Sequence, residues 1–212
     1  MPAATPLRTC VLAPALALVL AVAGCSSGPS SSPPGSSSAA GAPTPGASGF
    51  DGAALPEGVF APRLTLRDEQ GAPVSLASYR RRVVLVAFLY STCGAPCAVI
   101  AQQVRGALDE LDRRVPVLVI SADPAADTPA RVRSFLARVS LGGRALWLTG
   151  SPAQLRKLWH AFRVLPASAG QAAFARSASV FLIDRAGRER VIFQLEQLTP
   201  EALSHDVRKL LE

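Results

Sequence analysis

An α/β sandwich with a mixed central sheet is indicated by three features of this 212-residue chain. Short, continuous apolar runs recur along the sequence, and such runs are typical of strands buried on both faces. Helical patterns that open with a hydroxyl residue and a proline separate these runs. Turn signals also mark two hairpins, so antiparallel strand pairs are expected beside parallel ones. The expected order of elements is β-β-β-α-β-α-β-α-β-β-α.

The first elements are expected to be a hairpin and a buried strand. Residues 61–66 and 74–76 can pair around a turn at 68–71. The apolar run 83–89 has no polar residue, which predicts a central strand. A helical pattern then continues to Leu111.

The remaining elements follow the same two signals. Three more strands are predicted from apolar runs at 115–120, 145–148 and 180–183. Three helices are predicted to begin at Thr128-Pro129, Ser151-Pro152 and Thr199-Pro200, where a capping hydroxyl precedes a proline at the first helical position. A turn at 184–187 leads into a last strand at 191–195, and the helix that begins at Thr199 ends the chain.

The composition excludes several classes of protein. A hydrophobic content of 49% is enough for a core and excludes disorder throughout, while 4 cysteines are too few for a disulfide scaffold of this length. The 22 Lys and Arg residues exceed the 15 Asp and Glu residues, which gives a net charge of +7. The longest basic run is only Arg80-Arg81-Arg82, so nucleic-acid binding is not expected.

Residues 1–24 are expected to be an export signal. Arg8 is the only charged residue before the apolar stretch 11–23, which is shorter than the roughly 20 residues needed to span a bilayer. The tetrapeptide at 22–25 resembles the bacterial lipobox, and this resemblance implies that Cys25 is acylated and becomes the first mature residue. The alternative is an ordinary signal peptide with a chance cysteine.

Residues 25–57 are expected to be the lipidated cysteine and a flexible tether. Of the 24 residues from 26 to 49, 19 are Ser, Gly or Pro, and none is charged. Such a segment cannot bury enough surface to offset its ordering entropy. The expected protein is a folded domain at 58–212, anchored by lipid to the extracytoplasmic side of a bacterial cell membrane, where thiols meet oxidising conditions.

The candidate chemistry lies just after the strand 83–89. Cys93 and Cys97 follow this strand and open the next helix, at the end of the sheet where ligands collect in α/β folds. The N–H groups and dipole at the helix start would favour the Cys93 thiolate. A spacing of four residues lets the two sulfur atoms meet, so the pair could form a disulfide or bind a thiophilic ion such as Cu(I). The alternative is an inert disulfide that only stabilises the fold. Closing a loop of five residues would gain little stability from chain entropy.

Three segments resemble the SCO/SenC family, thioredoxin-fold proteins of copper handling. The Thr-Cys-x-x-x-Cys element at 92–97 is the first. Residues 121–129 are similar to the family's D-P-x-x-D-T-P stretch, and residues 181–187 to its late Y-L-I-D-x-x-G strand and turn. The resemblance spans about 59–212. It implies a thioredoxin-like fold in 58–212, with a central mixed sheet flanked by helices and an extra N-terminal hairpin.

The resemblance also implies a function. Cys93 and Cys97 would bind copper, as Cu(I), for insertion into cytochrome c oxidase. The implied partners are a copper-accepting oxidase subunit or other copper-site protein, a thiol–disulfide reductant, and the membrane through the lipid anchor. The same pair could instead catalyse thiol–disulfide exchange, with Cys93 attacking and Cys97 resolving. A non-catalytic binding module is the third alternative.

The chain departs from the family at its third copper ligand. Where the family has a histidine, this sequence has Arg176, whose guanidinium cannot coordinate copper. A cation facing the cysteines would favour the Cys93 thiolate and would weaken Cu(II) more than Cu(I). The alternative is that Arg176 points to solvent. His160 and His205 are both expected to be exposed and are not assigned as ligands.

Two aspartates and one loop complete the expected site. The segments Asp123-Pro124 and Asp127-Thr128-Pro129 are expected to end a strand and cap a helix, and their aspartates to modulate the cysteines. Gly94 and Ala98 stand where the family usually has proline, and Gly94 is expected to loosen the helix start. Residues 165–175 are rich in Ala and Ser and are expected to form a mobile loop.

Overall fold

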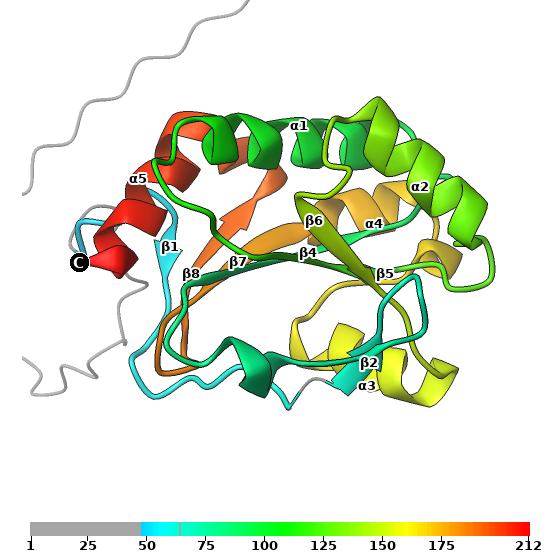
Figure 1. Cartoon of the computed structure of the whole chain (residues 1–212), viewed down its shortest axis with the longest axis horizontal. Coiled ribbons are helices and arrows are strands. Elements are labelled where there is room, and N and C mark those ends of the chain that lie inside the picture. Colours follow the sequence, from blue (N-terminus) through cyan, green and yellow to red (C-terminus); the bar gives the residue numbers. More distant parts are fainter. Residues whose placement is uncertain (1–47, 64) are drawn as a thin grey trace, which may run out of the picture. The chain divides into compact units, whose positions relative to one another are not determined.

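The computed structural model describes residues 48–63 and 65–212 (Figure 1). The predicted signal peptide, the lipidated Cys25 and most of the predicted tether lie outside these described residues. Within them, no helix combines the length and the apolar character needed to cross a bilayer.

A mixed sheet forms the centre of the domain, as predicted, and it has six strands. Its strands lie in the order β1-β8-β7-β4-β5-β6. Their bounds are β1 (Ala53–Ala54), β4 (Val84–Leu89), β5 (Val117–Ser121), β6 (Ala145–Leu148), β7 (Ser179–Ile183) and β8 (Glu189–Gln194). The pairs β4–β5 and β5–β6 are parallel, whereas β7 is antiparallel to β4 and to β8, and β1 is antiparallel to β8.

Helices cover both faces of this sheet. The helices are α1 (Ala95–Asp109), α2 (Pro129–Arg138), α3 (Pro152–Ala161), α4 (Gln171–Ser177) and α5 (Pro200–Leu211). Figure 1 shows α1, α2 and α5 above the sheet and α3 below it. Short 3₁₀ turns lie at η1 (Leu76–Tyr79), η2 (Ala167–Ala169) and η3 (Leu195–Gln197). This layered arrangement confirms the predicted α/β fold.

The predicted start signals are confirmed at three helices. The side chains of Thr128, Ser151 and Thr199 each accept a hydrogen bond from a backbone N–H in the first turn of α2, α3 and α5. Each of these caps satisfies a backbone donor that a helix start would otherwise leave unpaired. A proline follows every cap, where its fixed φ suits the first helical position.

The predicted N-terminal hairpin is present but shorter than expected. It consists of β2 (Thr65–Arg67) and β3 (Pro73–Ser75), and Asp68 accepts backbone hydrogen bonds within its turn. Arg67 exchanges backbone hydrogen bonds of 2.8 Å with Thr149, so the hairpin is attached just beyond β6.

The folded unit begins earlier than the expected boundary at residue 58. Phe50 is buried, and β1 pairs with β8. The backbone N–H groups of Asp51 and Gly52 each donate a 2.9 Å hydrogen bond to the Asp206 carboxylate on α5. A Cβ atom on Gly52 would lie 2.5 Å from a methyl carbon of Val191, so this close approach needs glycine.

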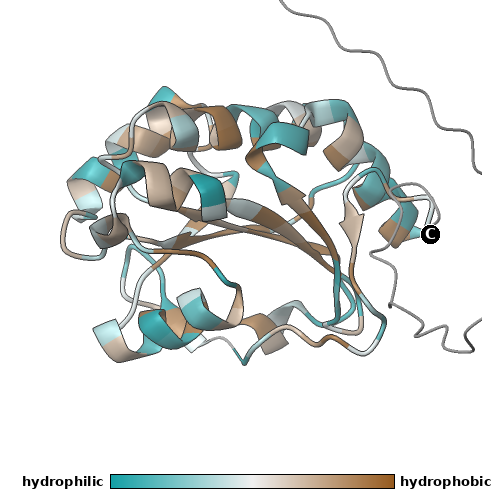
Figure 2. Ribbon diagram, turned by 180° about the vertical axis from the view of Figure 1, so that it is seen from behind, coloured by the Kyte–Doolittle hydropathy of each residue, from teal (hydrophilic) through white to brown (hydrophobic). Residues whose placement is uncertain are grey.

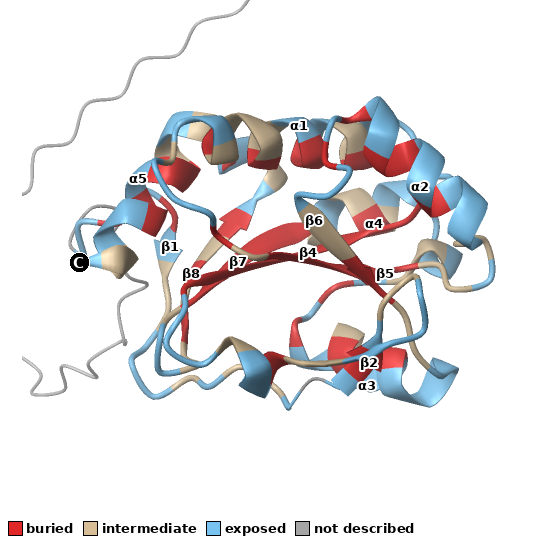
Figure 3. Ribbon diagram, viewed as in Figure 1, coloured by how far each residue is buried: buried red, intermediate tan, exposed pale blue. Residues whose placement is uncertain are grey.

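The core lies on both faces of the central strands. All six residues of β4 and all five of β5 are buried, and Figure 3 shows this layer in red. Phe88, Phe162 and Phe181 pack with ring centroids 4.7 to 6.2 Å apart. Figure 2 shows the apolar strands enclosed by helices with polar outer sides. A rigid sheet therefore fixes the loop that follows β4.

A short helix replaces part of the expected loop at 165–175. Residues 171–177 form α4, which lacks a side-chain cap and a periodic apolar stripe. Phe174 is its only buried residue, so one contact fixes a helix that the sequence pattern does not signal.

Candidate functional site

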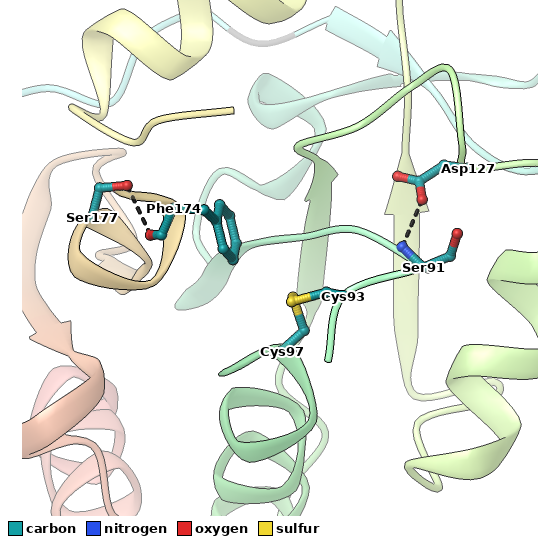
Figure 4. Close-up of a disulfide and its surroundings, with 6 residues drawn as sticks. All are labelled: Ser91, Cys93, Cys97, Asp127, Phe174 and Ser177. Atoms are coloured by element: carbon teal, nitrogen blue, oxygen red, sulfur yellow. Dashed lines mark hydrogen bonds between the residues drawn. A yellow bond between two sulfur atoms is a disulfide. The ribbon is translucent and has the colours of Figure 1, made fainter. Parts of the chain in front are cut away.

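Cys93 and Cys97 meet at the carboxyl end of β4, where the structure joins them in a disulfide (Figure 4). Their Cα atoms are 5.7 Å apart. Cys97 lies in the first turn of α1, whereas Cys93 precedes the Gly94 N-cap and lies in a turn closed by its N–H bond to the Tyr90 carbonyl. The two sulfur atoms approach as expected, although only one cysteine is on the helix.

The two cysteines differ in their access to solvent. Cys93 is 7% exposed and Cys97 is 0% exposed. A thiol or a metal ligand on another molecule therefore meets Cys93 first, and Cys97 is reached only through it or after a local opening. This asymmetry fits an attacking and a resolving cysteine in that order.

The side chain of Phe174 on α4 covers the disulfide. Figure 4 shows its ring pointing toward the two sulfur atoms. The ring packs edge-on against Tyr90 with centroids 5.0 Å apart, and Phe174 itself is fully buried. A Cβ atom on Gly94 would lie 2.9 Å from the Gln171 side-chain nitrogen, the end of an exposed and flexible side chain that can move aside. Sequence reasoning missed Phe174, although it is the only aromatic residue between residues 163 and 180.

Asp127 links the cysteine loop to the end of β5. One of its carboxylate oxygens accepts a 2.6 Å hydrogen bond from the Ser91 N–H, and the other accepts a 2.5 Å bond from the Ser121 hydroxyl. Burial raises the pKa of this carboxyl, and the hydrogen bonds from Ser121 and Ser91 oppose that rise. The cap of α2 comes from Thr128, within the segment Asp127-Thr128-Pro129 that was predicted to cap this helix, and Asp127 itself is a tertiary brace.

Asp123 lies beside the same loop. Its carboxylate accepts a 3.3 Å hydrogen bond from the Ala126 N–H, so it holds the turn that ends β5, as expected. Burial raises the pKa of Tyr90, and the negative charge of Asp123 raises it further. Tyr90 therefore stays a neutral phenol between Asp123 and Phe174.

Arg176 lies on the exposed side of α4. It is two residues from Phe174, or about 200° around the helix, so the two side chains point in opposite directions. Within the described chain it has no ion pair and no side-chain hydrogen bond. This placement agrees with the alternative that Arg176 points to solvent.

The histidines do not supply a third ligand to the cysteines. His160 is exposed on α3. The Nδ1 atom of His205 lies 2.9 Å from Asp206 and 3.3 Å from Asp51, beside β1 at the sheet edge and three strands from β4. Across residues 48–63 and 65–212, this is the only group of three or more residues spaced to hold a metal, so two sulfur atoms make up the candidate donor set at the cysteines.

Comparison with known proteins shows a consistent family. A model of the SCO1/SenC family matches residues 53–212. A curated relative from Stutzerimonas stutzeri, named "Putative copper-binding protein", is 28% identical over 108 residues, which are 49% of this chain and 52% of the relative. The chain thus spans about half the length of that relative.

Two solved structures illustrate the similarity of the fold. The apo Sco1 protein of Thermus thermophilus is 21% identical with a TM-score of 0.62, covering 76% of this chain and 96% of its own. The copper-bound ScoI of Bradyrhizobium japonicum is 26% identical with a TM-score of 0.53, covering 72% of this chain and 99% of its own.

Proposed function

Because this chain belongs to the SCO1/SenC family, we propose that it is an extracytoplasmic, membrane-anchored metallochaperone that carries Cu(I) on Cys93 and Cys97. Its acceptor would be a copper site of cytochrome c oxidase or of another copper protein. The observation that carries the proposal is the meeting of the two sulfur atoms at the start of α1, within the segment that the family model matches. The relatives' names support copper as the cargo.

The donor set fits Cu(I) better than Cu(II). Two thiolates are soft ligands and suit Cu(I), whereas Cu(II) prefers added imidazole or oxygen ligands. No histidine joins the sulfur atoms among the described residues. The start of α1 adds a positive dipole end, which offsets the negative charge of a bis-thiolate site.

Copper binding requires the disulfide to be opened first. A dithiol reductant would supply two electrons and two protons, and it would itself become a disulfide while Cys93 and Cys97 become thiols. Each thiol then releases its proton when Cu(I) binds. The chain's redox state and its copper state are therefore coupled through the same two atoms.

A Cu(I) titration tests this proposal. The reduced protein, with Cys10 and Cys25 replaced by serine, is titrated anaerobically against a chromophoric Cu(I) chelator. We expect one Cu(I) per chain, and we expect Cys93→Ala and Cys97→Ala each to lose it. Thr92→Ala, which changes an exposed neighbour, is the matched control. Undiminished Cu(I) binding by both cysteine variants would refute the proposal.

A second candidate function is thiol–disulfide exchange. It is favoured by the unequal burial of the two cysteines. The Cys93 thiolate would attack a partner's disulfide and form a mixed disulfide, releasing one partner thiol. Cys97 would then attack the Cys93 sulfur, which releases the second thiol and restores the disulfide that the structure contains. Turnover of a disulfide substrate that persists with a copper chelator present, and is lost in Cys93→Ala, would support this function.

The proposed membrane anchor rests on the lipobox-like segment alone. Growth with labelled palmitate in a bacterial host should label the protein, and Cys25→Ser should abolish the label. Cys10→Ser is the matched control because it lies inside the proposed signal. Equal labelling of the Cys25→Ser protein would rule out this attachment site.

A further inference from the structure

One stretch of this chain carries basic residues and no acidic ones. Residues 128–183 contain no Asp or Glu, although the whole chain has 15. The same segment carries eight exposed cations: Arg131, Arg133, Arg138, Arg144, Arg156, Lys157, Arg163 and Arg176. Among the described residues, only Arg144 of this set forms an ion pair, with Asp109. Arg156 and Lys157 on α3, with Arg163 just after it, therefore form a basic cluster on the face of the sheet opposite α2.

An apolar hollow opens beside this cluster, between α3 and the turn after β5. It has a volume of about 720 Å³ and is lined mainly by apolar side chains, among them Pro124, Trp159 and Val164, together with the carboxylate of Asp123. Leu165 also lines it and is 45% exposed beside the half-buried Trp159. Arg156 and His160 lie at the rim. We refer to this feature as the α3 hollow.

The α3 hollow is connected to the cysteine loop by a short chain of hydrogen bonds. The Trp159 indole N–H donates a 3.0 Å bond to the Ser121 carbonyl. The Ser121 hydroxyl donates to Asp127, which accepts the N–H of Ser91, two residues before Cys93. The hollow and Cys93 therefore flank the same end of the sheet.

We propose that the α3 hollow and its basic rim are the docking surface for an acidic partner polypeptide, whose apolar side chain enters the hollow while its thiol or metal ligand reaches Cys93. This inference rests on the proposed function, since the partner is the protein that exchanges copper or a disulfide with Cys93. Four cations on or beside α3 and α4 attract a negative partner over several ångströms and speed its encounter. A buried apolar anchor then fixes its position.

A polypeptide fits this surface better than a lipid headgroup layer. A concave apolar hollow matches a single protruding side chain, whereas a flat anionic membrane leaves it unfilled. A membrane pressed against this face would also cover the approach to Cys93. The charge and the hollow together therefore favour a protein ligand.

The test measures how fast Cys93 captures charged peptides. The reduced Cys97→Ala protein, with Cys10 and Cys25 as serine, reacts with cysteine peptides activated as 2-pyridyl disulfides. The Cys93 thiolate forms a disulfide with the peptide sulfur, and the released pyridine-2-thione is followed by absorbance. One peptide carries four glutamates and a tryptophan, the second carries four lysines and the same tryptophan, and the third replaces the tryptophan of the first with glycine.

We expect the acidic tryptophan peptide to react at least about tenfold faster than the lysine peptide at low salt, with the difference lost at high salt. The acidic peptide with glycine in place of tryptophan should react more slowly than the acidic tryptophan peptide. Arg156→Glu, Lys157→Glu and Arg163→Glu together should abolish the preference. The control variant makes the same change in charge at the other end of β4, with Arg82→Glu, Arg113→Glu and Arg114→Glu. It should keep the preference for the acidic peptide.

Two further measurements separate the possible outcomes. An uncharged pyridyl disulfide should react at the same rate with the Cys97→Ala protein and with the same protein that also carries the three α3 reversals, which we call the α3-reversed protein. Equal rates show that the Cys93 thiol itself is intact. Equal rates for acidic and basic peptides, or equal loss in both triple variants, would overturn the docking surface. A third outcome would also overturn it: the α3-reversed protein loses binding to phosphatidylglycerol vesicles, while the Cys97→Ala protein shows no preference among the peptides. The Cu(I) titration of the same proteins reports on the proposed function separately, because neither triple variant alters Cys93 or Cys97.

Discussion

Replacing Phe174 with alanine should expose the disulfide to reduction without unfolding the domain. Phe174 is fully buried, is the only buried residue of α4, and packs edge-on against Tyr90. Burying a phenylalanine contributes about 1.5–3 kcal/mol, and the aromatic pair adds about 0.5–1.5 kcal/mol. Losing about 2–4.5 kcal/mol of docking free energy would raise the open population of α4 by roughly 30- to 2,000-fold.

The assay is the rate at which dithiothreitol reduces the Cys93–Cys97 disulfide under native conditions, followed by thiol labelling. We expect the Phe174→Ala protein to be reduced at least about 30-fold faster than wild type, because attack on the sulfur atoms then requires less opening. Phe135→Ala is the matched control: Phe135 is also buried, but it packs against Trp147 beneath α2. Similar reduction rates for wild type and Phe174→Ala would refute the idea that α4 covers the site.

Three further predictions concern single side chains. Burial raises the pKa of Glu189 from 4.5 to about 7, so the folded state holds this proton more tightly than the unfolded state does. The free energy of unfolding should therefore fall by up to about 3 kcal/mol as pH rises from 4.5 to 7. Glu189→Gln should remove that fall in urea titrations, and an unchanged dependence of stability on pH in this variant would contradict the prediction. Asp127→Ala leaves the Ser91 N–H and the Ser121 hydroxyl without their acceptor and should lower the free energy of unfolding by about 2–4 kcal/mol. Asp123→Ala loses one hydrogen bond of 3.3 Å and should lower it by under about 1 kcal/mol. Equal losses of stability in the two variants would show that Asp127 is no brace. Arg176→His places an imidazole on the outer side of α4, so Cu(II) titration should show no gain in affinity, and a new Cu(II) site would disprove the assigned orientation of α4.

The central sheet was predictable because each strand carries its own signal. The runs that became β4 and β5 contain almost only apolar residues, and a strand buried on both faces needs nothing else. The starts of α2, α3 and α5 were predictable for a similar reason, since a hydroxyl and a proline act within one turn. Local chemistry decided these elements before any tertiary contact formed.

The missed features depend on contacts between distant segments. β1 has only two residues, and it follows a stretch of Gly, Ser and Pro that predicts no structure. It forms because it pairs with β8 and because Asp206 accepts a hydrogen bond from the backbone just before it. α4 has one buried side chain, and its position depends on Tyr90. The bracing role of Asp127 was not predicted for the same reason, because its partner Ser91 lies 36 residues earlier in the chain.

The cysteine pair was found from spacing, but its accessibility was not. Two cysteines four residues apart predict that the sulfur atoms can meet. Which sulfur faces solvent depends on α4, and the sequence suggested a mobile loop in that place. Helical periodicity also turns Arg176 away from the cysteines, whereas an extended loop could have turned it inward.

Unequal burial and a minimal donor set bear on the same step of the proposed function, the transfer of copper. If the two thiolates hold Cu(I) without a third ligand, transfer to an acceptor site with more ligands would be downhill. Cys93 is the less buried of the two cysteines and would be the first that an acceptor meets, whereas Cys97 is fully buried. Once the metal has left, the same sulfur atoms can close into the disulfide if an oxidant takes up two electrons, which prevents reloading until a reductant acts. A basic docking face beside Cys93 would bring an acidic acceptor to that sulfur, and the covered pair would limit the loss of copper elsewhere.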